Sequence, residues 1–160
     1  MRTLAAKPLT ADAFRAYGCV FEAPTDFKRT YFDEALASSR PAARPSLSVA
    51  RVQPLASSTL ITSKMERHEF SSQSFIPLDV GRYLVIVAPM STTDRPDETR
   101  LEAFLAQGTQ GVTYGQNVWH HPLTVLDRPA SFAITMWLDG SQTDEQFVEL
   151  ETPLTVTFRA

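Results

Sequence analysis

The three histidines of this chain occupy two short segments. His68 lies in the first segment, between Glu66 and Gln73, and His120 and His121 lie together in the second. Histidine is the side chain most often used for proton transfer near neutral pH, and it is also the commonest metal ligand. Because the whole supply of histidine is concentrated in two places, we expect one site to which two strands contribute.

The first segment has the alternation of a β-strand. With a period of two residues, Glu66 and His68 share one face and Arg67 points the other way. Both residues could enter the interior of a barrel, where a buried carboxylate needs a metal, a histidine or a cationic ligand as its partner. The alternative is that both side chains lie on a solvated sheet face, where charged residues are usually found.

The second segment predicts a turn followed by a strand. Gly115 and Asn117 tolerate positive φ, and the turn would deliver His120 and His121 to opposite faces. Pro122 restricts His121 to an extended conformation. The alternative is a structural histidine that is bonded to a backbone carbonyl beside a core tryptophan.

The elements that must position these residues are mostly strands. The sequence predicts strands over residues 46–53, 60–70, 82–88, 123–126, 131–138, 146–150 and 154–158, with Pro153 in a turn between the last two. It predicts a short helix from Leu9 to Tyr17, capped by Thr10, and a second helix that begins at 94–98 and continues through Leu105. Short strands with proline and glycine between them indicate an antiparallel sandwich or barrel.

Composition limits the class of protein. A chain of 160 residues is long enough for one domain, 1–160, and too short for two ordinary ones. Its formal net charge of −3 provides no basic patch for nucleic acid and no polybasic anchor for a membrane. The single cysteine excludes an internal disulfide, so we expect the reducing cytoplasm.

The spacing of the two histidine segments is similar to that of the two cupin motifs. These have the forms His-X-His-X(3,4)-Glu and Pro-X-Gly-X-X-His. In the first motif Glu66 takes the first histidine position, His68 the second and Gln73 the glutamate position. In the second motif Gly115 takes the proline position, Asn117 the glycine position and His120 the histidine position. The spacing is retained while several residue types differ.

A closer resemblance is to the ureidoglycolate lyase family. It is carried by residues 66–68, 73–77 and 117–123, and also by 8–18, 101–104 and 110–112. It covers most of the chain and is thinnest at 27–45 and near the C-terminus. It implies a cupin-type antiparallel β-barrel (a jelly roll with a few short helices), a homodimer, and the cleavage of (S)-ureidoglycolate to glyoxylate and urea in allantoin catabolism. It also implies nickel or another divalent metal, with no organic cofactor.

The residues suggest how such a reaction could proceed. His68, His120, Glu66 and Gln73 would be the ligands if a metal binds. Without a metal, Glu66 or His120 could act as the base and the other histidine as the acid. We expect Arg51 to bind the substrate carboxylate together with Gln73, because Arg51 shares a strand face with apolar residues and an arginine there suggests an anion. A solvated guanidinium is the alternative.

Two other functions stay open at this point. A ureidoglycolate hydrolase would release ammonia instead of urea, and it would need an activated water and an oxyanion stabiliser. A non-catalytic cupin would bind a small carboxylate without turnover. The sequence shows no separate constellation of residues for the water or the stabiliser that the hydrolase needs.

Overall fold

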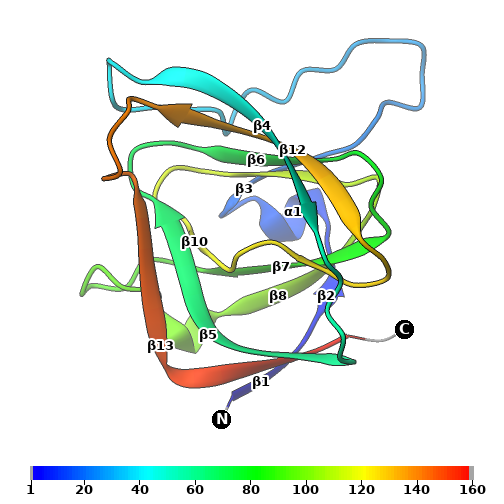
Figure 1. Ribbon diagram of the computed structural model, residues 1–160, viewed down its shortest axis with the longest axis vertical. Helices are drawn as coiled ribbons and strands as arrows, with labels where there is room; N and C mark the ends of the chain where they lie inside the picture. Colours follow the sequence, from blue (N-terminus) through cyan, green and yellow to red (C-terminus); the bar gives the residue numbers. More distant parts are fainter. Residues whose placement is uncertain (1, 159–160) are drawn as a thin grey trace.

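The computed structural model describes residues 2–158, which form two β-sheets that face each other (Figure 1). In chain order the elements are β1 (Arg2–Ala5), β2 (Lys7–Pro8), α1 (Ala11–Phe14), β3 (Gly18–Phe21), β4 (Arg44–Val52), β5 (Thr59–His68), β6 (Gln73–Pro77), β7 (Arg82–Ala88), a 3-10 turn (Glu98–Arg100), β8 (Glu102–Gln107), β9 (Gly111–Tyr114), β10 (Trp119–His120), β11 (Thr124–Val125), β12 (Ala130–Leu138) and β13 (Glu145–Thr157). No helix of this part of the chain is long and apolar enough to cross a membrane.

The larger sheet has the strand order β1-β13-β5-β10-β7-β8-β2, with β11 paired to β7, and the smaller has the order β3-β9-β6-β12-β4. Most neighbouring strands run antiparallel, and the larger sheet curls into a nearly closed barrel-like surface (Figure 1). The predicted class, mainly β with few short helices, is confirmed.

Apolar side chains fill both sides of the larger sheet. One cluster lies between the two sheets and includes Phe75 and Phe132 of the smaller sheet and Val85 of the larger. A second cluster lies on the other side of β7 and includes Ile86 and Trp119. The strand predicted at 82–88 is therefore confirmed, with both of its faces buried.

The helix predicted from residue 94 through Leu105 is wrong. Asp97 caps only the 3-10 turn, and the chain then enters β8. Phe104 packs in the cluster between the sheets while Ala103 and Leu105 pack in the other one. Because both faces of β8 are buried, its apolar residues occur consecutively and imitate a helical stripe.

Two further predictions needed correction. Residues 146–150 and 154–158 are not separated by a turn; they belong to the single strand β13, whose register shifts between Glu149 and Leu154. Pro153 lies within this irregularity, where the ladder does not require its missing N–H. The predicted helix at 9–17 is shorter, although Thr10 does cap it as expected.

Candidate active site

Three strands, two of the larger sheet and one of the smaller, bring four of the predicted site residues together. Glu66 and His68 come from β5, His120 from β10 and Gln73 from β6, and His120 is the direct cross-strand partner of Glu66. Their exposed fractions are 7%, 2%, 1% and 8%, in the order Glu66, His68, His120 and Gln73. The alternative that Glu66 and His68 lie on a solvated face is therefore wrong.

His120 is held at both ring nitrogens. Its Nδ1 lies 2.9 Å from the carbonyl oxygen of Val118, and its Nε2 lies 3.3 Å from Oε1 of Glu66 and 3.2 Å from Oε1 of Gln73. A carbonyl can only accept, so Nδ1 carries a hydrogen. A neutral ring would then offer only a lone pair to Glu66, and the His120–Glu66 contact therefore requires a second proton, shared between Nε2 and the carboxylate.

The surroundings of Glu66 favour its ionised form. Burial by itself raises the pKa of this carboxyl, but the hydrogen bond from His120 and the charge of that histidine lower it by more, so the net pKa is below the ordinary value. The shared proton therefore lies on the His120 side of the pair, which makes His120 the proton donor of the site.

His68 differs from His120 in its hydrogen bonding and in its protonation. It is buried, and neither ring nitrogen has a hydrogen-bond partner among the described residues. Burial and then the charge of His120 lower the pKa of His68, so the ring is neutral near pH 7. Its ring lies 5.9 Å from that of His120, at an angle of 28°. A buried ring nitrogen with a free lone pair can accept a proton from a bound molecule.

Tyr114 and Asp144 also belong to this site, and neither was among the predicted site residues. Tyr114 stacks on His120 with ring centroids 4.1 Å apart. Asp144 is buried, accepts a hydrogen bond from the Phe70 amide at 2.7 Å, and lies 3.8 Å from Nδ1 of His68. The stacking of Tyr114 could have been suspected from its place just before the turn, whereas no spacing connects Asp144 to His68.

His121 lies outside the cluster, as predicted from strand parity. Its Nδ1 donates to the Pro122 carbonyl at 2.6 Å, and its Nε2 accepts from the Thr62 hydroxyl at 3.0 Å. The turn that precedes it is also as expected, with Asn117 at a φ of 62°. Burial is the main reason why the pKa of His121 falls to about 4.

Arg51 does not reach the site, which corrects the prediction that it binds the substrate. Its cross-strand partner is Ser131, whose neighbours Ala130 and Phe132 are fully buried, so Arg51 and Ser131 share the outer face of the smaller sheet. Its guanidinium bonds to Ser131 at 2.9 Å and to Asp79 at 3.2 Å. The apolar residues of that face, Leu47 and Val49, are 70% and 67% exposed. The solvated alternative is thus the correct one.

The four proposed metal ligands do not fit a tightly held transition metal. Among residues 2–158 no three His, Cys, Asp or Glu side chains are arranged to hold a metal ion. A metal at Nε2 of His120 would also have to displace the proton that the contact with Glu66 requires, which weakens metal binding. No step of the reaction proposed below therefore passes through a metal.

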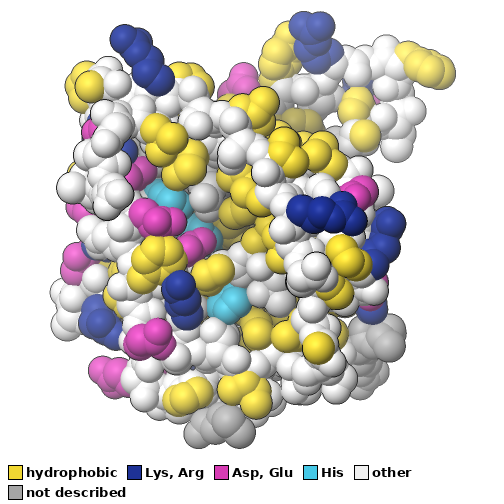
Figure 2. Space-filling model, in the orientation of Figure 1, with side chains coloured by type: hydrophobic (Ala, Val, Ile, Leu, Met, Phe, Trp, Pro, Cys, Tyr) yellow, Lys and Arg dark blue, Asp and Glu magenta, His cyan; other side chains and the backbone are white. Residues whose placement is uncertain are grey.

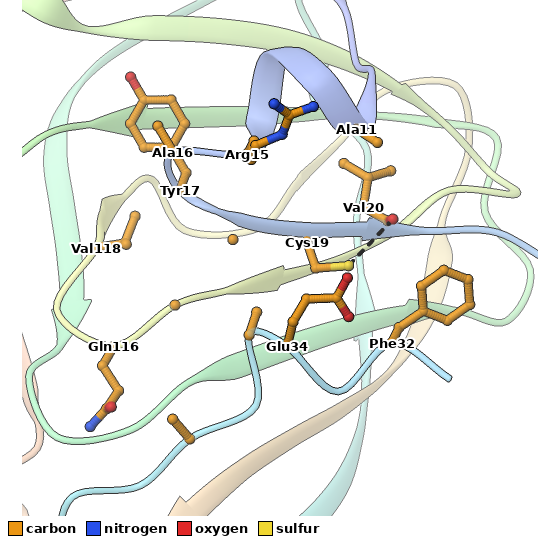
Figure 3. A pocket seen from close by; sticks show the side chains of 14 residues that line it. Ala11, Arg15, Ala16, Tyr17, Cys19, Val20, Phe32, Glu34, Gln116 and Val118 are labelled. Atoms are coloured by element: carbon orange, nitrogen blue, oxygen red, sulfur yellow. Dashed lines mark hydrogen bonds between the residues drawn. The ribbon is translucent and has the colours of Figure 1, made fainter. Parts of the chain in front are cut away.

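The histidines lie in a hollow of the molecular surface, bordered by acidic side chains (Figure 2). A separate groove of about 720 Å³ lies between α1, β3 and the segment 32–37 (Figure 3). None of the predicted site residues lines it, and its Arg15 is bonded to Asp12. Val118 lines this groove and also holds Nδ1 of His120, so the turn at 115–118 contributes to both features.

The lowered pKa of His121 predicts a dependence of stability on pH. Between pH 6.5 and about 4 the unfolded chain binds a proton at this residue that the folded chain excludes, so stability falls as the pH falls. When the pH is lowered from 7 to 5, the free energy of unfolding should fall in both proteins. We expect this fall to be about 2 kcal/mol smaller in His121→Gln than in the unmodified protein. Urea unfolding at both values measures this. Equal losses in the two proteins would contradict the assignment.

Comparison with known proteins identifies the family. The ureidoglycolate lyase family model matches residues 1–157. A relative from Agrobacterium fabrum is 38% identical over 98% of this chain and 96% of its own length. The ureidoglycolate lyase of Escherichia coli O1:K1 is 39% identical over 78% of this chain and 81% of its own. A solved structure of Bacillus subtilis oxalate decarboxylase has a TM-score of 0.43 and 13% identity over 90% of this chain and 30% of its own, too low to carry an argument. The chain belongs to the ureidoglycolate lyase family.

Proposed function

We propose that this chain is a ureidoglycolate lyase, which cleaves ureidoglycolate into glyoxylate and urea by proton transfer between buried histidines. The observation that carries this proposal is the pairing of two unlike histidines in one buried cluster. His120 holds a proton against Glu66, and His68 has no hydrogen-bond partner. The family membership and the names of its relatives agree with this reaction.

The reaction needs one base and one acid at the same carbon. That carbon carries the hydroxyl group and the ureido nitrogen of the substrate. His68 accepts the hydroxyl proton through its free ring nitrogen, and the carbonyl of glyoxylate forms as the C–N bond breaks. The bond's electron pair goes to the nitrogen, which takes a proton from Nε2 of His120 and leaves as urea. The proton taken up by His68 then returns to the His120–Glu66 pair through solvent.

This assignment of base and acid differs from both assignments considered from the sequence, in which Glu66 or His120 was the base. Since its pKa is lowered by burial, His68 is neutral near pH 7 and has no proton to donate. Glu66, whose pKa is also low, keeps the proton on His120 instead of acting on the substrate. Gln73, whose Oε1 lies 3.2 Å from Nε2 of His120, would hydrogen-bond the ureido group through its side-chain amide.

Four further properties of the protein stay predictions: its cellular compartment, its oligomeric state, its metabolic pathway and its enzyme subclass. The single cysteine, Cys19, is free and agrees with a reducing compartment such as the cytoplasm. A homodimer, a role in allantoin catabolism and the carbon–nitrogen lyase subclass stay predictions that follow from the family.

Analysis of the products tests the proposed reaction. With ureidoglycolate as substrate, we expect glyoxylate and urea in equal amounts and no ammonia. Because the site residues do not fit a tightly held metal, we expect the rate to stay within about twofold after treatment with a chelator. Release of ammonia in place of urea would identify a hydrolase, and glyoxylate binding without turnover would identify a binding protein. A large loss on chelation that added nickel restores would show that a metal takes part.

Replacing either histidine tests the site itself. We expect His120→Ala and His68→Ala each to lower kcat by about 10²-fold or more, because each removes one of the two proton-transfer groups. Arg51→Ala, on the outer face of the smaller sheet, serves as the control and should leave both kcat and KM near their original values. Near-normal rates in both histidine variants would show that the reaction occurs elsewhere.

A further inference from the structure

The proposed substrate is an anion, and the buried site is rich in acidic groups. Glu66 and Asp144 are buried within it, and Glu145 is the direct cross-strand partner of His68. Bringing a carboxylate to such a place requires a cation that is not already neutralised. Identifying that cation deepens the proposed function and depends on it.

Two nearby arginines are already engaged elsewhere. Arg67 lies on β5 between Glu66 and His68, but it points to the other face, where both of its terminal nitrogens bond to Asp94 at 2.7 and 2.9 Å. Arg40 bonds to Asp139 at 2.7 Å and lies 3.4 Å from Asp144. Neither guanidinium can receive a carboxylate without losing the partner it has.

Lys64 is in a different situation. It precedes Glu66 by two residues on β5, so both side chains leave the strand on the same face. Its ammonium lies 4.2 Å from the ring centroid of Phe147, and Phe147 is the direct cross-strand partner of Glu66. The ammonium is therefore held against the residue that faces the catalytic pair.

The ammonium of Lys64 also has no acidic partner. No ion pair or hydrogen bond of its Nζ is found among residues 2–158, and the ammonium instead lies over the ring of Phe147. Glu149, opposite Lys64 in the register, is bonded instead to the Ser63 hydroxyl. Both Lys64 and Phe147 are exposed, so this contact lies on the solvent side of the buried cluster.

We propose that Lys64 binds the substrate carboxylate at the entrance to the site, with its ammonium positioned by the face of Phe147. Because the carboxylate is bonded directly to the hydroxyl-bearing carbon, the lysine stem would extend inward from the ring of Phe147, and that carbon would lie between His68 and His120. A lysine on a flexible stem provides a point charge that can follow the carboxylate as the product leaves.

The charges around the entrance agree with this role. Burial and repulsion by Glu66 raise the pKa of Glu145, whereas Lys64 opposes that rise. Lys64 also disfavours a positive charge on His121. The charge of Lys64 thus acts on Glu145 of β13 and on His121, which follows β10.

Steady-state kinetics with ureidoglycolate test the proposal. We expect Lys64→Met to raise KM by about 10- to 100-fold, the range for one lost charge-assisted hydrogen bond, while kcat changes less than about threefold. Lys28→Met removes the same charge from an exposed lysine paired with Asp26, and it should leave KM unchanged. Lys64→Arg keeps the charge and should recover most of the lost affinity.

Binding of glyoxylate and of urea, measured separately by calorimetry, separates this role from a merely structural one. Lys64→Met should weaken glyoxylate binding by the same factor as it raises KM, and it should leave urea binding unchanged. An unchanged KM in Lys64→Met, or an equal rise in Lys28→Met, would overturn the assignment of Lys64. If the unmodified protein does not convert ureidoglycolate at all, the proposed function fails, and the assignment of Lys64 fails with it.

Discussion

The contact between His120 and Glu66 is the interaction on which the site depends. A buried carboxylate is costly unless it is paired, and a buried histidine that already donates from Nδ1 has no second hydrogen to offer while it is neutral. Placed 3.3 Å apart, the two groups satisfy each other only by holding one proton between them. The contact therefore keeps a proton on His120. Burial and then the charge of His120 lower the pKa of His68, which keeps His68 neutral.

The fold keeps this contact in place from both sides of the larger sheet. On one side Tyr114 stacks on His120, and on the other Trp119 packs in the second apolar cluster. Arg67 is the main connection on that second side, because it is 2% exposed, lies 4.6 Å from the ring of Trp119, and bonds to Gln146 on β13. The strands that carry Glu66 and His120 are thus joined to each other and to β13 directly behind the site.

The sequence was sufficient for strands with strong periodicity, such as β4, β7 and β12, but it did not predict β6, β8 or β9. The parity of Glu66 and His68, the turn at Asn117 and the opposite directions of His120 and His121 follow from local geometry alone, and the structure agrees with each. Local geometry fails where tertiary packing decides. β8 resembles a helix in sequence because both of its faces are buried, and β4 carries apolar residues outward. Arg51 was misplaced for this reason, since alternation does not say which face of an edge strand is the inner one.

The most direct test of the account is a double-mutant cycle on kcat with Glu66→Gln and His120→Gln. If one shared proton makes the two residues a unit, the double variant should be no slower than the slower single variant, within about twofold. Equal activity in Glu66→Gln and the unmodified protein, or rate losses that simply multiply in the double variant, would show that the two residues act independently and would contradict the account.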